Sequence, residues 1–162
     1  MSQPVGINIK AKSEDVINTA ISRDKNINTE SGNPYGAFIN ESERRLGALE
    51  PQQIDVAELT LILGGTSKNV ANLAEVFIGD VDVAFVIEDS NNTYDVWHVI
   101  DPTGVSSAVD VNFDSRTIAA QDAAKFLGGG FKVVIRGTAA ASFSGKGAEA
   151  DLQLTFGFAA FE

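Results

Sequence analysis

Apolar and polar residues alternate along most of the chain after residue 50, and this pattern predicts a β-rich fold. Leu59, Leu61 and Leu63 recur at every second position up to a Gly-Gly break, which is the period of a strand. The same period recurs at residues 81–88, 93–100, 108–113, 131–135 and 152–158. Turn-forming residues at 89–92, 101–104 and 144–147 separate these stretches. We therefore expect a series of short strands joined by turns.

One segment of this region changes to a helical period. A stripe of apolar residues with the spacing of a helix crosses residues 117–127. Asp114 or Ser115 can cap its start, and Gly128 can end it in the left-handed conformation. The pattern predicts one short helix.

The first 50 residues are more polar and richer in turn-forming residues. Val5, Ile7 and Ile9 alternate with polar residues, which predicts a strand over 5–11. Ser13 precedes two acidic residues as an N-cap does, so a short helix is expected over 14–23. We expect an N-terminal arm over 1–50 and a β-domain over 51–162.

About seven strands with one or two short helices indicate a mainly β fold. The predicted fold is an antiparallel β-sandwich, Ig-like or jelly-roll-like, with an extended N-terminal arm. Helices are too few to cover both faces of a parallel sheet. The alternative is a single curled sheet with one helix across its mouth.

Composition and charge narrow the function. The 162 residues suit one domain, and the formal charge of −10 disfavours binding to phosphate backbones. The absence of cysteine excludes disulfides and thiolate chemistry. No apolar run approaches the roughly 20 residues of a membrane span, and no signal peptide is visible. These features predict a soluble protein made in the cytoplasm, with no nucleic-acid or membrane partner. They leave its final location open, which would be a virion or filament if the protein is an assembly subunit.

Candidate chemistry is sparse, and we assign no catalytic residue, cofactor or firm metal ligand. His98, the only histidine, lies inside a predicted strand on the face of Tyr94 and Val96, so we interpret it as a partly exposed strand residue. The Gly-rich segment at 64–68 lacks the earlier glycine of a phosphate loop, and the one at 128–130 ends a helix instead of starting one, so both are interpreted as turns.

A weak calcium candidate lies in the turn after residue 88. Asp89, Asn91, Thr93 and Asp95 are spaced two apart, as the oxygen ligands of a calcium loop are. The glycine that such a loop needs at its sixth position is replaced by Tyr94. A simple hairpin is the competing interpretation.

Three classes of function remain. We favour a non-enzymatic assembly subunit of a virion, phage tail or filament, which binds copies of itself or other structural subunits. It would associate through its β-domain, where Gly157 and Ala159 give a small-residue face, and through its arm. Val5, Ile7 and Ile9 would add a strand to the open sheet edge of a neighbour, unless the arm folds back onto its own domain.

The second class is a ligand-binding or carbohydrate-binding β-sandwich module. Tyr94 and Trp97 are its candidate contact aromatics, because sugars stack on exposed aromatic rings. The third class is a hydrolase that uses a pair of carboxylates. Nothing in the spacing of the acidic residues selects such a pair.

Overall fold

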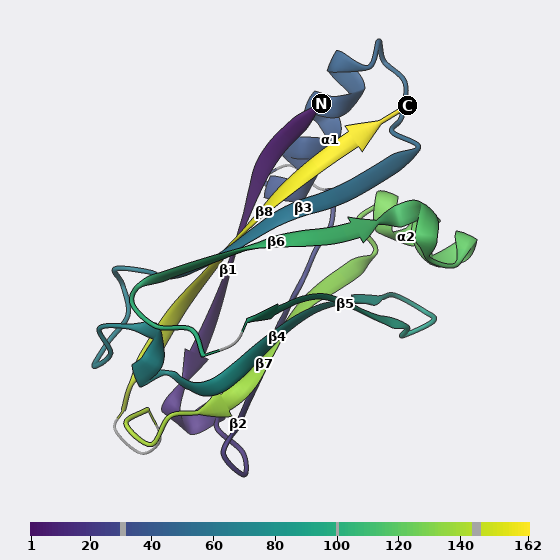
Figure 1. Cartoon of the computed structure of the whole chain (residues 1–162). Coiled ribbons are helices and arrows are strands. Elements are labelled where there is room, and N and C mark those ends of the chain that lie inside the picture. Colours follow the sequence, from purple (N-terminus) through teal and green to yellow (C-terminus); the bar gives the residue numbers. More distant parts are fainter. Residues whose placement is uncertain (30–31, 100, 144–146) are drawn as a thin grey trace.

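In the computed structural model the chain forms two antiparallel sheets that pack face to face (Figure 1). Residues 1–29, 32–99, 101–143 and 147–162 are described. Within these ranges the strands are β1 (Ser2–Lys12), β2 (Ala20–Asn26), β3 (Gln53–Leu63), β4 (Phe77–Ile87), β5 (Thr93–Val99), β6 (Ser106–Asp114), β7 (Phe131–Ala139) and β8 (Glu149–Phe161). The helices are α1 (Pro34–Arg45) and α2 (Ala120–Leu127), and short 3-10 turns lie at Ser13–Asp15, Leu73–Glu75 and Ser115–Thr117.

The strand order is that of a jelly roll. Sheet A has the order β1-β8-β3-β6, and sheet B has the order β2-β7-β4-β5. The antiparallel pairs β1–β8, β2–β7, β3–β6 and β4–β5 are those of one long double strand rolled into two sheets. The predicted antiparallel sandwich is therefore confirmed, with eight strands instead of about seven, and the jelly-roll arrangement replaces the Ig-like one.

Every strand predicted after residue 50 coincides with an observed strand. The predicted turn at 144–147 and the predicted strand end at residue 100 fall mostly outside the described residues, although Gly147 is described and has a φ of +62°.

The first 50 residues are not a separate arm, because each sheet takes one strand from them. β1 pairs along its whole length with β8 of the same chain, and Val5, Ile7 and Ile9 are buried in the common core. The segment thus folds back onto its own domain, which was the alternative interpretation. The division into 1–50 and 51–162 does not describe how the strands are distributed.

The helix predicted over 14–23 is replaced by a 3-10 turn and by β2. Ser13 does not cap a helix, since its hydroxyl donates to the carbonyl oxygen of Phe143 at 2.6 Å and accepts from the Ala148 amide at 2.8 Å. Ile21 is the one buried residue of β2. As an edge strand with little burial, β2 lacks the alternation that reveals the other strands.

Helix α1 was not predicted. Asn33 caps it by accepting a hydrogen bond from the Tyr35 amide at 3.0 Å, and Pro34 occupies its first turn. Tyr35, Phe38 and Ile39 form its buried stripe.

Helix α2 coincides with the later part of the helix predicted over 117–127, with corrections at both ends. Its N-cap is Ala119, without a side-chain hydrogen bond, and Asp114 instead caps the preceding 3-10 turn by accepting from the Arg116 amide at 2.8 Å. Gly128 is the C-cap residue with a φ of −81°, and it is Gly129 that takes the left-handed conformation, with a φ of +79°. A Cβ atom at Gly129 would lie 3.0 Å from the Asn28 backbone, which is a second reason for glycine there.

Both helices cover the same end of the sandwich, above a cluster of aromatic rings. α1 lies beside the chain termini, and α2 lies near the ends of β6 and β7 (Figure 1). The rings of Tyr35, Phe126 and Phe131 contact one another, and Phe126 and Phe131 have centroids 4.5 Å apart. The Tyr35 hydroxyl donates to the Phe126 carbonyl at 2.7 Å, so the buried phenol is satisfied and links α1 to α2. Burial of this phenol raises its pKa far above the usual value.

Candidate functional site

The outer face of sheet A carries an uncharged band that crosses all four strands. Strand register aligns two adjacent rows, Gly6–Thr155–Thr60–Ala108 and Asn8–Gln153–Ile62–Ser106, which we call the neutral face. The alternate residues Ile7, Leu154 and Leu61 are buried, which turns these eight residues outward. Most of their side chains are small, so the band has low relief as well as no charge.

Charged residues border the neutral face at two ends of the strands. On one side Lys10 pairs with Glu149 at 3.2 Å. On the other side Glu58 and Asp110 are cross-strand partners of like charge. A shallow hollow of about 340 Å³ lies next to Glu58, over Gly157 and Ala159. The small-residue face predicted at Gly157 and Ala159 is therefore a half-buried part of this surface.

The β1 edge of sheet A is partly closed by side chains from β2. The Arg23 guanidinium donates to the Lys10 carbonyl at 3.1 Å, and the Lys25 ammonium donates to the Asn8 carbonyl at 3.1 Å. Exposed strand edges usually invite pairing with another chain, and charged side chains are a common way to prevent it. Strand addition at this edge would have to displace both hydrogen bonds.

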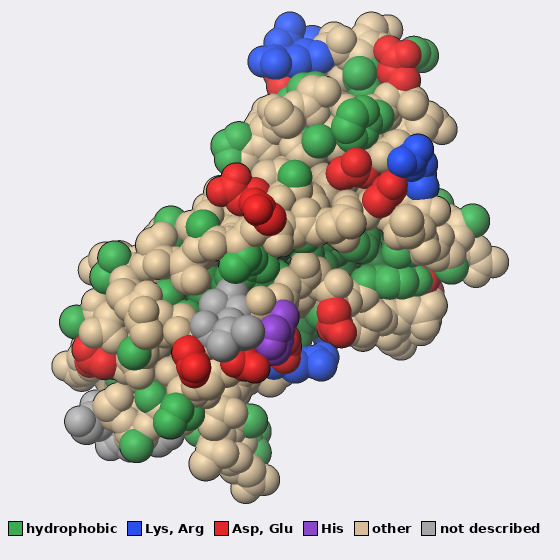
Figure 2. Space-filling view, in the orientation of Figure 1, with side chains coloured by type: hydrophobic (Ala, Val, Ile, Leu, Met, Phe, Trp, Pro, Cys, Tyr) green, Lys and Arg blue, Asp and Glu red, His purple; other side chains and the backbone are tan. Residues whose placement is uncertain are grey.

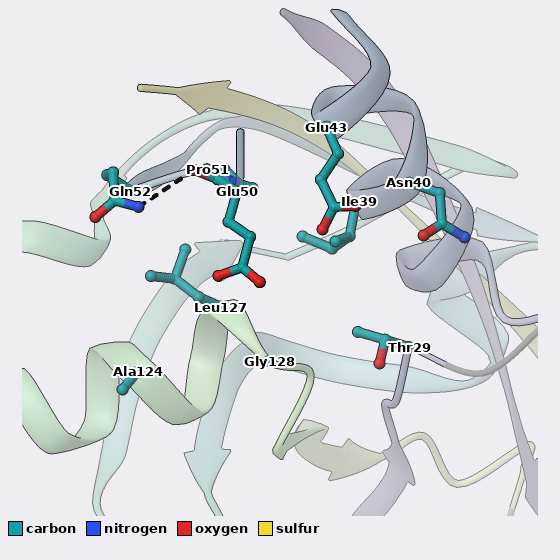
Figure 3. A pocket seen from close by; sticks show the side chains of 10 residues that line it. All are labelled: Thr29, Ile39, Asn40, Glu43, Glu50, Pro51, Gln52, Ala124, Leu127 and Gly128. Carbon is teal, nitrogen blue, oxygen red and sulfur yellow. Dashed lines mark hydrogen bonds between the residues drawn. The ribbon is translucent and has the colours of Figure 1, made fainter. Parts of the chain in front are cut away.

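A cleft of about 480 Å³ opens between α1, the segment before β3 and the end of α2. Its polar lining comprises Thr29, Asn40, Glu43, Glu50 and Gln52, and its apolar lining comprises Ile39, Pro51, Ala124 and Leu127. Figure 3 shows the Glu43 and Glu50 side chains extending into the space between the two helices. The cleft is of small-ligand size. Sequence reasoning missed it, because its residues come from four separate segments.

The predicted calcium loop is the turn of the β4–β5 hairpin. Asp89 lies 2.7 Å from the Lys125 ammonium on α2, and Asp95 lies in β5 opposite Ala84. Asn91 has a φ of +57° at the turn. The calcium site stays a prediction, with Asp89 already engaged by a cation. Among the described residues, no group of three or more His, Asp or Glu side chains is placed to hold a metal ion.

Trp97 and Tyr94, the two aromatic residues predicted to contact a ligand, do not form an exposed flat surface. Trp97 is 4% exposed, and within the described part of the chain its Nε1 atom has no hydrogen-bond partner. Tyr94 is partly buried, and its hydroxyl donates to Asp122 Oδ2 at 2.5 Å. Ser90 and Asn92 donate to the same carboxylate at 2.8 Å each. These three hydrogen bonds hold the pKa of Asp122 below its usual value.

His98 lies on the outer face of sheet B between two aspartates, and Figure 2 shows the histidine side chain beside acidic ones. A bulge in the β4–β5 ladder buries both Val96 and Trp97, so His98 faces solvent and not the side of Val96. Its Nδ1 atom lies 2.5 Å from Asp82 and its Nε2 atom 3.1 Å from Asp80. The hydrogen bond to Asp82 is the main cause that raises the pKa of His98. The prediction of a partly exposed strand histidine fits this position.

None of the helices in the described part of the chain is both long enough and apolar enough to span a bilayer.

Comparison with known proteins identifies no relative by sequence. No protein family matches the chain, and no curated protein matches it. Solved structures with a similar course of the chain include the Drosophila NLP core, described in terms of pentamer formation and histone binding. It is 9% identical over 100% of this chain and 99% of that one, with a TM-score of 0.35.

Plant virus capsids give similar values. A cowpea mosaic virus empty virus-like particle is 10% identical over 99% of this chain and 83% of that one, with a TM-score of 0.41. Broad bean stain virus is 8% identical over 100% and 86%, with a TM-score of 0.43. These neighbours are capsid proteins and a pentamer-forming protein, but the identities and TM-scores are too low to transfer a function to this chain.

Proposed function

We propose that this protein is a non-enzymatic structural subunit that associates with copies of itself through the neutral face of sheet A. The main support for this proposal is the pair of uncharged rows across all four strands of sheet A, in a chain whose formal charge is −10. The kind of assembly, whether virion, phage tail or filament, remains the prediction made from the sequence.

Charge explains why this face is favoured for self-association. Two copies of an acidic chain repel each other, and a contact that buries unpaired carboxylates also loses their hydration. The neutral face avoids both costs. Its small side chains in addition lose little rotamer entropy when they are covered.

The size of the face also supports a second copy as the occupant. The whole outer face of sheet A, with four strands spaced about 4.8 Å apart and about 36 Å long, presents roughly 700 Å² of projected surface, and the neutral face is its central part. A standard interface buries about 800 Å² on each partner. Because Arg23 and Lys25 occupy β1 carbonyls, contact through the face is favoured over addition of a strand at this edge.

Jelly rolls also occur in lectins and cupins, so the fold alone does not decide the function. The alternative of a carbohydrate-binding module depends on Tyr94 and Trp97. Trp97 is buried, and Tyr94 is partly buried with its hydroxyl bound to Asp122, so the two rings do not form an exposed pair. We therefore favour assembly over carbohydrate binding through these residues.

The test is a charge placed at the centre of the neutral face. Light scattering from micromolar to millimolar concentration should show wild-type mass rising above the 17.1 kDa monomer. Thr60→Glu should hold the mass near the monomer value, because like charges would oppose each other across the contact. Ser22→Glu adds the same charge to an exposed position of sheet B, opposite Arg136, and should assemble as wild type does.

Two results would contradict the proposal: a wild-type protein that stays monomeric throughout, or a Thr60→Glu protein that assembles normally. The melting transition of each variant shows whether it is folded.

A further inference from the structure

The cleft between α1 and α2 is lined by two carboxylates, those of Glu43 and Glu50. In the described part of the chain neither Glu43 nor Glu50 forms an ion pair. The nearest cations along the sequence are engaged elsewhere. Arg44 and Arg45 both bind Glu41, and Lys125 binds Asp89. The two arginines hold the pKa of Glu41 down to about 2, but they leave Glu43 uncompensated.

The end of α2 adds to the negative potential of the cleft. Leu127 is the last residue of the helix and Gly128 its C-cap, and both line the cleft. The C-terminal end of a helix carries a partial negative charge and favours cations. Because the carbonyls of Ala124, Lys125 and Phe126 accept hydrogen bonds from the glycine amides that follow the helix, this contribution is small, and the two carboxylates supply most of the negative charge.

The remaining lining is apolar and sits beside the charged groups. Ile39 is buried, Ala124 and Leu127 line the cleft from α2, and the Leu127 side chain extends toward Glu50 (Figure 3). A ligand that fits both parts has a short apolar stem and a cationic head. Among the described residues that line the cleft none is aromatic, so these residues offer no stacking surface of the kind that sugar sites use.

We propose that this cleft binds an alkylammonium or alkylguanidinium group, with its head between Glu43 and Glu50 and its stem against Ile39 and Leu127. The group belongs to a free amine or to a lysine or arginine side chain of another chain, and both share this chemistry. The site is independent of the assembly face, because it lies at the helix-covered end of the sandwich.

The test is an NMR titration of the full chain below the concentration at which it assembles. The probes are n-butylammonium and n-butylguanidinium, with n-butanol as the uncharged comparison. Saturable shifts are expected at the backbone amides of Asn40, Ala124 and Gly128, with a dissociation constant on the order of millimolar. Capped tripeptides Gly-Lys-Gly and Gly-Arg-Gly distinguish the sources, since they bind as well as the free amines only if the site accepts a side chain.

Variants with the same loss of charge separate the site from a general effect of the acidic surface. Glu43→Gln with Glu50→Gln should weaken binding at least about fivefold. Glu14→Gln with Asp101→Asn removes two exposed carboxylates that do not line the cleft and should bind as wild type does. The single changes Glu43→Gln and Glu50→Gln cover the case in which the double variant fails to fold.

The proposal is overturned if the cations give no saturable shifts, if n-butanol binds equally well, or if the Glu43/Glu50 variant binds like wild type. None of these outcomes depends on whether the neutral face assembles.

Discussion

The hydroxyl of Tyr94 on β5 donates a hydrogen bond to the carboxylate of Asp122 on α2, at 2.5 Å. Ser90 and Asn92 of the hairpin turn donate to the same carboxylate. Asp122 is 2% exposed. This one carboxylate therefore fastens the β4–β5 hairpin to α2, and α2 in turn covers the aromatic cluster at the end of the sandwich.

Replacing Asp122 by Asn should change how stability depends on pH. The pKa of Asp122 is lowered by its hydrogen bonds from Tyr94, Asn92 and Ser90. A carboxyl with a lowered folded pKa stabilises the protein above its unfolded value of 3.8, and this stabilisation is lost as pH falls through the folded pKa. The difference in unfolding free energy between wild type and Asp122→Asn should be constant above about pH 5 and should shrink below about pH 4.

Chemical denaturation at a series of pH values measures this difference. Glu41 and Asp114 also have lowered pKa values, but both proteins contain them, so their contributions cancel. A difference that persists unchanged to about pH 2 would show that Asp122 is not stabilised as a carboxylate.

His98 should give the opposite dependence on pH. The charged groups around it are Asp82, Asp80 and Arg136. Arg136 is the cross-strand partner of Asp82 in β7. The hydrogen bond to Asp82 raises its pKa above 6.5. A group with a raised folded pKa stabilises the protein fully below its unfolded value and loses this effect as pH rises through the folded pKa. The stabilisation should therefore decline as pH rises above 6.5.

Proton NMR checks this directly, because the chain has one histidine. The titration midpoint of His98 is expected above 6.5 in wild type and should fall toward that value in Asp82→Asn. An unperturbed wild-type midpoint would mean that the His98–Asp82 contact does not form in solution.

The alternation of apolar and polar residues predicted the strands that bury one face. It did not predict β2 and α1, and the reason is physical in each case. β2 buries only Ile21, so its sequence carries almost no period. α1 had the signals of a helix start in Asn33 and Pro34, but its glycine and its run of charged residues obscured the buried stripe. The sequence pattern reflects which residues are buried. It therefore does not predict an element that buries very few residues, or one whose buried residues are interspersed with glycine and charged residues.

The functional surfaces were harder to predict, because they depend on contacts between distant residues. The oxygen-bearing residues of the hairpin turn are spaced like the ligands of a calcium loop. The residues between those predicted ligands, Ser90, Asn92 and Tyr94, bind Asp122, which lies about 30 residues further on. Alternation does indicate that Thr60 and Thr155 face outward. Only the strand order shows that they lie side by side.

Gly137 should tolerate no side chain, although its position in β7 is regular. A Cβ atom there would lie 2.6 Å from the ring of Phe77. Overpacking of this kind costs about 1–3 kcal/mol, so Gly137→Ala should lower the unfolding free energy by that amount. Gly65→Ala is the control, because its Cβ would meet nothing within 4 Å. It should be neutral or stabilise by up to about 1 kcal/mol, and equal effects of the two changes in urea denaturation would contradict the predicted packing.

Phe126 should contribute more to stability than any exposed phenylalanine, since it joins α2 to the core. Its ring is fully buried and lies against Phe131 and Phe85, with centroids 4.5 Å and 5.2 Å away. Phe126→Ala leaves a cavity between α2 and sheet B, which should cost about 3–5 kcal/mol in urea denaturation. Phe161 is 43% exposed at the end of β8, so Phe161→Ala should cost about 1 kcal/mol or less. If the two changes cost the same, α2 packs only loosely on the sandwich, and the cleft that it borders has no fixed wall.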